Sequence, residues 1–120
     1  MESYQGMEVW QRGMKIAELI YQLTRSFPKE ELYGMTSQLR RSATSVPANI
    51  AEGWGRNNNK EFVNFLRIAN GSLREMETHL ILAQRVNLCT LNQAEPILQE
   101  SQILSKQILN LKRSISPKNI

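Results

Sequence analysis

The chain has 120 residues with 41% apolar content, a formal net charge of +4 and a pI near 9.5, which fits one domain and is compatible with a polyanionic partner. Its single cysteine, Cys89, excludes an internal disulfide and a thiolate metal cluster. The N-terminal segment lacks the apolar stretch of a signal peptide and no run approaches the ~18 apolar residues of a membrane span, so we expect a cytoplasmic protein.

Apolar residues recur at helical spacing over residues 7–25, and Phe27-Pro28 ends this first predicted helix. Its core stripe is Val9, Ile16, Ile20 and Leu23. We expect four further residues to widen that stripe, namely Trp10, Met14, Ala17 and Tyr21.

A second helix is predicted over residues 36–54, with Thr36 as its N-cap. Its apolar positions are Leu39, Ala43, Val46, Ile50 and Gly53. Pro47 lies inside this pattern and removes one backbone hydrogen bond, so we predict a kink there without a break. The segment Gly53-Trp54-Gly55 reads as a C-terminal cap and turn.

The third predicted helix, residues 59–86, opens with Asn58 and Glu61, a variant of the capping box. Its apolar seam alternates spacings of four and three residues, which is typical of left-handed helix packing, and consists of Phe62, Leu66, Ala69, Leu73, Met76, Leu80 and Ala83.

The fourth helix is predicted over residues 91–115, with Thr90 and Gln93 as a capping pair and Ser116-Pro117 as its end. Pro96 suggests that its regular part starts only after Asn92. No segment alternates as a strand does. The fold class is therefore all-α, an antiparallel up-down four-helix bundle, with residues 1–120 forming one domain.

Basic residues form a stripe on the third helix, where Lys60, Arg67 and Arg74 recur every seven residues away from the seam. Three further arginines, Arg40, Arg41 and Arg56, complete a surface on which phosphates are expected to bind without sequence readout. The alternative is an ordinary solvated helix face, partly neutralised by acidic neighbours.

Two other sets of residues lie beside the seams. A polar row on the second helix includes Gln38, Ser45, Asn49 and Glu52, and it is expected to form a structural hydrogen-bond seam, with a ligand or subunit contact as the alternative. Apolar residues on the outside of the third helix indicate a homo-oligomer interface and are Val63, Ile68, Ile81 and Leu82.

Catalysis finds little support in the sequence. His79 is the only histidine, and neither a nucleophile with a nearby base nor a metal-ligand cluster can be assembled around it. The glycine pair at Gly53 and Gly55 follows a helix and lacks the lysine of a phosphate-binding loop. We therefore expect no catalytic residue, no metal and no cofactor.

Two segments, QLRRSATSVPANIAEGWGR from Gln38 to Arg56 and EFVNFLRIANGSLREME from Glu61 to Glu77, resemble the four-helix-bundle proteins encoded by intervening sequences of bacterial 23S ribosomal RNA genes. The resemblance implies a ring, expected to be a homopentamer, with a basic surface for nucleic acid. A related branch is similar to the accessory variability determinant of diversity-generating retroelements, which partners a reverse transcriptase and its RNA. The family pattern falls on Gln38, Arg40, Arg41, Ser45, Asn49, Glu52, Gly53, Ala69, Ser72 and Glu75.

Three functional hypotheses follow from these observations. The first is a non-enzymatic, oligomeric protein that binds nucleic acid, with RNA expected, through its basic residues. The second is a protein-interaction scaffold without nucleic-acid contact, in which the basic face complements a partner's charge. The third is a small enzyme or ligand-binding bundle that uses Ser45, Asn49 and Glu52.

Overall fold

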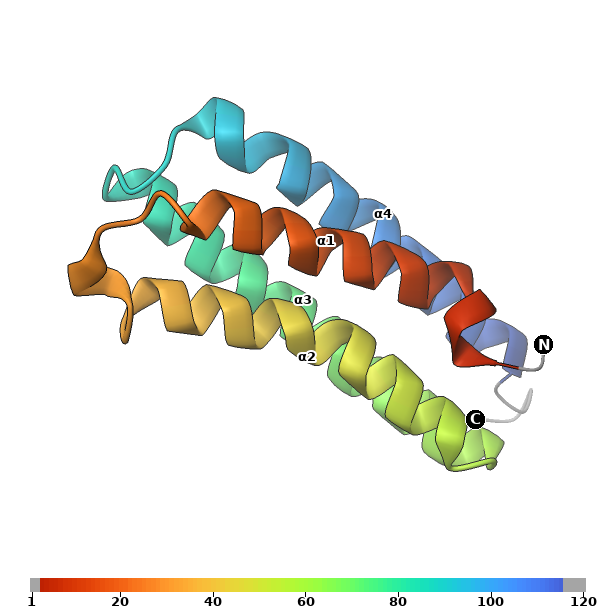
Figure 1. Cartoon of the computed structure of the whole chain (residues 1–120). Helices are drawn as coiled ribbons and strands as arrows, with labels where there is room; N and C mark the ends of the chain where they lie inside the picture. Colours follow the sequence, from red (N-terminus) through yellow and green to blue (C-terminus); the bar gives the residue numbers. More distant parts are fainter. Residues whose placement is uncertain (1–2, 116–120) are drawn as a thin grey trace.

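Four helices pack side by side in the computed structural model, which describes residues 3–115 (Figure 1). They are α1 (Glu8–Thr24), α2 (Met35–Gly55), α3 (Asn59–Arg85) and α4 (Leu91–Ile115), with short 3-10 segments η1 (Tyr4–Gly6) and η2 (Lys29–Glu31). Each long helix begins and ends within one residue of its expected range. The predicted all-α, four-helix bundle is confirmed, and it measures 46 × 21 × 20 Å.

The helices are arranged in a cycle in which each contacts the next along the chain and α4 returns to α1. Pairs of contacts show the antiparallel order. Along α2 and α3, Ser45 meets Ser72 and Gly53 meets Phe65. Along α3 and α4, Asn70 meets Ser105 and Glu77 meets Ser101. Helices α1 and α3 contact the same two neighbours, α2 and α4, and therefore lie on the diagonal of the bundle. Side chains on their outer faces cannot share one surface.

The core lies along the axis of the bundle, and α3 contributes more of its buried apolar residues than any other helix. Every residue of the predicted α3 seam is buried, from Phe62 to Ala83, and Leu66, Leu73 and Leu80 are fully so. Opposite residues include Ile20 of α1, Leu39 of α2 and Ile108 of α4, each 0% exposed. Because burying such a side chain stabilises the fold by ~1.5–3 kcal/mol, this shared core sets the relative positions of the helices.

Side-chain caps define two helix starts as expected. Asn58 accepts a hydrogen bond from the backbone nitrogen of Glu61 at 3.0 Å. Thr90 and Gln93 exchange two bonds, from the Thr90 nitrogen to Gln93 Oε1 at 2.9 Å and from the Gln93 nitrogen to Thr90 Oγ1 at 3.1 Å. Helix α4 accordingly begins at Leu91, and the expected later start after Asn92 is wrong.

The start and end of α2 differ from the sequence interpretation. Its N-cap residue is Gly34, Thr36 is buried in the first turn, and Glu31 Oε1 accepts the backbone N–H of Met35 at 3.1 Å. The carboxylate of Glu31, from the preceding segment, therefore caps the helix in place of Thr36. The helix also continues through Gly55, and the turn that follows contains Asn57 at a positive φ of 55°.

Both internal prolines are tolerated, because the helices containing Pro47 and Pro96 continue past them. Figure 1 shows α2 bending near its middle, the part of the chain where Pro47 lies.

No helix within residues 3–115 is long and apolar enough to cross a membrane. The predicted helix end at Ser116-Pro117 lies outside the described residues.

Candidate nucleic-acid interface

The outward face of α3 carries a continuous row of exposed residues that contains no acidic side chain. This α3 outer row consists of Lys60, Asn64, Arg67, Gly71, Arg74, Thr78, Leu82 and Arg85. Steps of three and four residues keep the row on one side of the helix, at ~1.5 Å of rise per residue. Four cationic groups thus follow about 37 Å of helix.

The acidic residues of α3 lie beside the row and contact other parts of the protein. Glu77 accepts a hydrogen bond from Ser101 of α4 at 2.6 Å, and its side chain is only 16% exposed. Glu61 lies 3.6 Å from Arg56, and Glu75 lies 3.9 Å from His79. The expected neutralisation of the stripe by Glu75 and Glu77 is therefore confined to the position of Arg74.

Arg74 belongs to a polar network between α3 and α4. Its guanidinium donates to Glu77 at 2.5 Å, to Ser105 and, at 3.4 Å, to Asn70. Ser105 in turn donates to Asn70 at 2.8 Å. Because Glu77 balances its charge and Ser105 fixes its position, Arg74 has a structural role that the seven-residue spacing did not reveal.

Lys60 and Arg67 carry positive charges that no carboxylate of the described residues balances. Arg67 donates to Asn64 at 2.5 Å, a neutral partner on the same helix. Within residues 3–115 neither Lys60 nor Arg67 lies in an ion pair, and Arg85 in the last turn of α3 has none either. These three side chains are available to an anionic ligand.

Arg56 is held at the turn between α2 and α3. It lies 2.8 Å from Glu52 and 3.6 Å from Glu61, and its guanidinium carbon stands 5.0 Å from the centre of the Phe65 ring. The hydrogen bond to Glu52 raises the pKa of Arg56 above its ordinary value. The predicted contact residue is therefore satisfied by two carboxylates.

Arg40 and Arg41 lie apart from the α3 outer row. Arg40 faces α1, where its Nε donates to Thr24 Oγ1 at 2.9 Å and its guanidinium carbon lies 4.4 Å from the centre of the Tyr21 ring. Arg41 is exposed on α2 and donates to Gln38 at 3.2 Å. Since α1 and α3 are diagonal, the six predicted basic residues do not form one surface.

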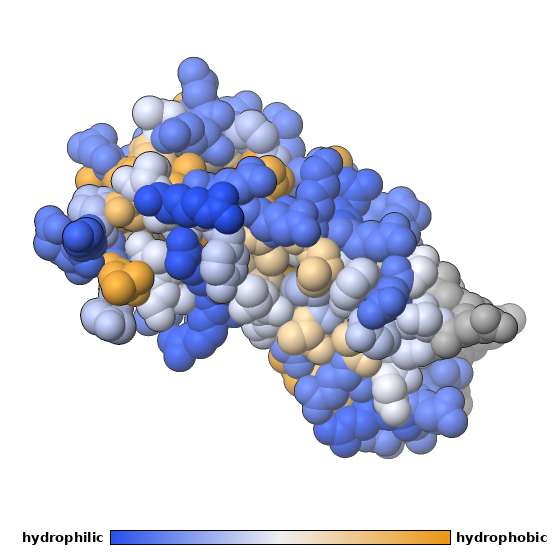
Figure 2. All heavy atoms as spheres, in the orientation of Figure 1, coloured by the Kyte–Doolittle hydropathy of each residue, from blue (hydrophilic) through white to orange (hydrophobic). Residues whose placement is uncertain are grey.

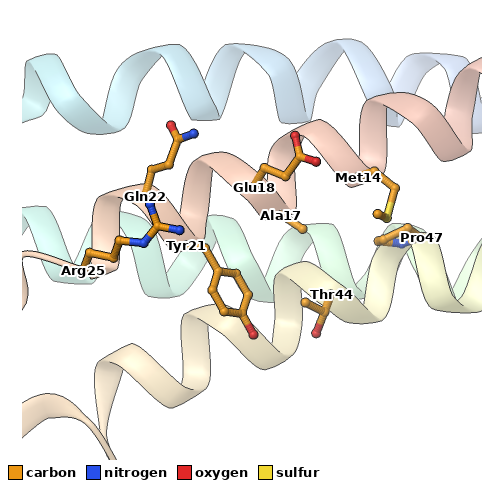
Figure 3. A pocket seen from close by; sticks show the side chains of 8 residues that line it. All are labelled: Met14, Ala17, Glu18, Tyr21, Gln22, Arg25, Thr44 and Pro47. Atoms are coloured by element: carbon orange, nitrogen blue, oxygen red, sulfur yellow. The ribbon is translucent and has the colours of Figure 1, made fainter.

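A groove between α1 and α2 was missed by the sequence interpretation (Figure 3). Met14 and Tyr21, expected to widen the core stripe, are 37% and 40% exposed and line this α1–α2 groove. Figure 3 shows Tyr21 reaching from α1 toward Thr44, and Met14 beside Pro47. In the space-filling view, weakly apolar residues, drawn in pale orange, lie near the middle of this face, and more strongly apolar groups show between hydrophilic residues elsewhere (Figure 2).

The polar row of α2 is partly enclosed between α2 and α3. Ser45 and Ser72 place their hydroxyl oxygens 2.9 Å apart, and the Asn49 amide donates to the Ser45 hydroxyl at 2.9 Å and its carbonyl at 2.8 Å. Gln38 and Glu52 are exposed and bond to Arg41 and Arg56 instead. The row is thus enclosed only in its middle, at Ser45 and Asn49, and its ends form hydrogen bonds at the surface.

The apolar residues assigned to an oligomer interface do not form one patch. Val63 and Ile81 are about five turns apart and point the same way, whereas Ile68 and Leu82 point about 100–140° away from them. Ile68, Ile81 and Leu82 are 43%, 39% and 47% exposed, and Val63 is half-buried. Leu82 belongs to the α3 outer row itself, whereas Val63 and Ile81 lie beside the row toward α4 and Ile68 lies on its other side.

Acid–base and metal chemistry have few groups to use in this fold. Among residues 3–115 no cluster of three or more histidine, cysteine or acidic side chains is placed to hold a metal ion. His79 Nε2 is buried without a hydrogen-bond partner and lies 3.9 Å from Glu75. Burial raises the pKa of the Cys89 thiol, which keeps it protonated at neutral pH.

Comparison with known proteins adds two similarities. Residues 5–110 match the family described as 23S rRNA-intervening sequence protein. Among solved structures, a protein of unknown function from the S23 ribosomal protein family of Bacteroides thetaiotaomicron is similar, with a TM-score of 0.77 and 28% sequence identity. The similarity covers 87% of this chain and 97% of that one. No curated protein matches the sequence.

Proposed function

We propose, from the premise that the chain belongs to the 23S rRNA-intervening sequence protein family, that it is a non-enzymatic, oligomeric bundle that binds nucleic acid, with RNA as the expected ligand. One observation carries this proposal. The α3 outer row exposes Lys60, Arg67 and Arg85 without an acidic residue among them. The protein is placed in the cytoplasm as part of the same proposal.

The spacing of these cations suits a phosphate backbone. Seven residues of helix separate Lys60 from Arg67, about 10 Å along the axis, so each side chain can reach a different phosphate. Arginine and lysine contacts of this kind position nucleic acid but carry no sequence information. The predicted binding is therefore non-specific in sequence and weakens as salt rises, because counterions are released from the phosphates.

The proposal assigns different roles to the predicted basic residues. Lys60 and Arg67 bind phosphates, while Arg56 and Arg74 support the surface through their bonds to Glu52 and Glu77. Charge reversal at Lys60 and Arg67 therefore removes ligand contacts without breaking an ion pair of the described residues. This separation makes the proposal testable in a folded protein.

The test compares two double variants with the same change in net charge. Lys60→Glu with Arg67→Glu alters the α3 outer row, and Lys15→Glu with Lys106→Glu alters exposed sites on α1 and α4. Fluorescence anisotropy with a labelled structured RNA between about 50 and 200 mM salt measures affinity and its salt slope. We expect the first variant to lose at least about tenfold in affinity. The slope of the logarithm of the binding constant against the logarithm of the salt concentration should become shallower by roughly two. The control should retain binding. Equal losses of affinity in the two variants would mean that the RNA responds to the net charge of the protein and not to the α3 outer row. Absence of binding at low salt would refute the proposal.

Self-association is the second part of the proposal. A ring of five subunits is the assembly that the family resemblance implies, and its mass would be five times the 13.8 kDa of the chain. Light scattering on the purified protein measures this mass directly. A monomer at micromolar concentration would contradict the oligomeric part while leaving nucleic-acid binding open to its own test.

A protein-interaction scaffold is the second candidate function. It is favoured by exposed apolar residues at and near the connection between α3 and α4. Leu82, Val86 and Leu91 are 47%, 55% and 54% exposed. The reverse transcriptase that we propose as a partner, by analogy with the retroelement accessory proteins, belongs to the leading nucleic-acid-binding function, whereas the scaffold would dock a partner enzyme without nucleic acid. Under this alternative, Leu82→Lys abolishes capture of the partner, whereas reversal of Lys60 and Arg67 has little effect.

A further inference from the structure

Two hollows on the surface join into one long groove between α1 and α2. The first, of 440 Å³, is lined on its floor by Met14, Ala17 and Pro47, and the second, of 480 Å³, extends to the loop residue Tyr33. Tyr21 and Thr44 line both hollows, so the α1–α2 groove is continuous.

Aromatic side chains in this groove are unusually accessible. Tyr33 is 92% exposed and Tyr21 is 40% exposed. Helical and loop positions of this exposure gain little from hydrophobic burial, so the fold of the monomer does not explain the ring of Tyr33. A flat ring in solvent is a surface on which a planar ligand can stack.

Tyr21 is held in a fixed orientation. Arg40 covers its ring at 4.4 Å, and Arg40 is itself fixed by the bond from its Nε to Thr24 Oγ1 at 2.9 Å. Thr24 is buried and donates to the backbone oxygen of Ile20 at 2.8 Å. This chain of contacts positions the tyrosine before any ligand arrives, which reduces the entropic cost of binding.

The charge of the groove favours an anionic ligand. Arg25, Arg40 and Arg41 line it, against a single carboxylate, Glu18, among the residues that form its walls. Arg25, which directly follows α1, and Arg41, on α2, are both exposed. Aromatic rings flanked by exposed arginines match the chemistry of an unpaired nucleic-acid strand, whose bases stack while its phosphates stay in water.

We propose that the α1–α2 groove binds the unpaired bases of single-stranded nucleic acid, with Tyr21 and Tyr33 stacking on bases and Arg25 and Arg41 contacting the neighbouring phosphates. This inference rests on the proposed function and deepens it, because it adds a site for unpaired strands to the α3 outer row. The groove is a separate surface from that row, since it lies between α2 and α1, the helix diagonal to α3. One bundle therefore presents a phosphate-binding surface and a base-stacking groove.

The experiment measures anisotropy of a labelled ten-nucleotide oligouridylate and of a duplex of the same length. Tyr33→Ala and Tyr21→Leu are expected to weaken binding of the single strand on the order of tenfold each, and to leave the duplex unchanged. Leu32→Ala is the matched control, because Leu32 lines the same hollow and is 47% exposed but has no ring. Tyr33→Trp should restore single-strand affinity, and the fluorescence of the new indole should be quenched on binding.

The outcomes separate the two proposals. If reversal of Lys60 and Arg67 weakens both ligands while the tyrosine variants change neither, the groove inference fails and the proposed function stands. If neither ligand binds at low salt, the proposed function fails. If the oligouridylate does not bind, but a labelled acidic helical peptide binds and Tyr21→Leu weakens that binding, the groove serves a protein partner. This outcome would overturn the inference.

Discussion

Gly53 of α2 lies so close to Phe65 of α3 that a β-carbon at position 53 would stand 2.6 Å from the Cβ of Phe65. The same atom would be 3.0 Å from Cδ1 of Phe62. Real β-carbons do not tolerate such a distance, and the Cβ of Phe65 cannot move without its backbone. The close approach of α2 and α3 at this end of the bundle therefore requires glycine.

Gly53→Ala is accordingly expected to destabilise the protein by about 1–3 kcal/mol, because overpacking outweighs the better helix propensity of alanine. Thermal unfolding followed by circular dichroism measures the change. The matched control is Gly71→Ala on α3, where the added methyl group would meet nothing within 4 Å. This control should gain about 0.5–1 kcal/mol in the monomer. Equal effects at the two positions would contradict the contact.

The hydroxyl contact between Ser45 and Ser72 predicts a measurable coupling between α2 and α3. Ser45→Ala removes the 2.9 Å contact to Ser72 and one of the two bonds from Asn49, and is expected to cost about 0.5–1.5 kcal/mol. Replacing both serines by alanine should cost less than the sum of the single changes, since neither hydroxyl is then left unpaired. Urea unfolding of the two single variants and the double variant measures the coupling, and strict additivity would show that the hydroxyls do not interact.

The two internal prolines should respond differently to alanine. Pro96 is exposed near the start of α4, so Pro96→Ala restores a backbone hydrogen bond and is expected to stabilise the protein by about 1–2 kcal/mol. Pro47 is buried and packs beside Gly13 of α1, so Pro47→Ala loses contacts that offset the restored bond. Urea unfolding compares the two variants. An equal gain at both positions would mean that the Pro47 ring contributes nothing to the α1–α2 contact.

The core and the helix ends were accessible from the sequence because they depend on local rules. On α3 the alternation of four- and three-residue steps places Phe62, Leu66 and Leu73 on one line, whatever packs against it. Asn58 and Thr90 act on backbone groups within three residues, so their capping roles are visible in the sequence alone. The start of α2 was harder, since its capping carboxylate, Glu31, comes from an adjoining 3-10 turn.

The surfaces depend on which helices are neighbours, and spacing does not reveal that. Arg40 and Arg67 were both assigned to one basic surface, yet Arg40 faces α1 and Arg67 faces solvent on the diagonal helix α3. Arg74 has the same seven-residue spacing as Arg67, but Glu77 balances its charge, and only the position of Ser105 on α4 shows that its guanidinium is held between the two helices. Met14 and Tyr21 lie at the edge of the apolar stripe of α1 and remain partly exposed. They line the groove because the contact between α1 and α2 does not cover the full width of that stripe.

Cys89 predicts a pH dependence of stability at high pH. Burial raises the pKa of its thiol above the ordinary value of 9.0, whereas the unfolded chain releases that proton near pH 9.0. Between the two pKa values the folded protein binds more protons than the unfolded chain, so stability is full below pH 9.0 and falls as pH rises through the folded pKa. Urea midpoints measured one unit below and one unit above pH 9.0 should therefore fall further for the wild type than for Cys89→Ala. Lysine and tyrosine titrations are common to both proteins and cancel in the comparison, so an identical fall would mean that the thiol is solvated in the folded protein.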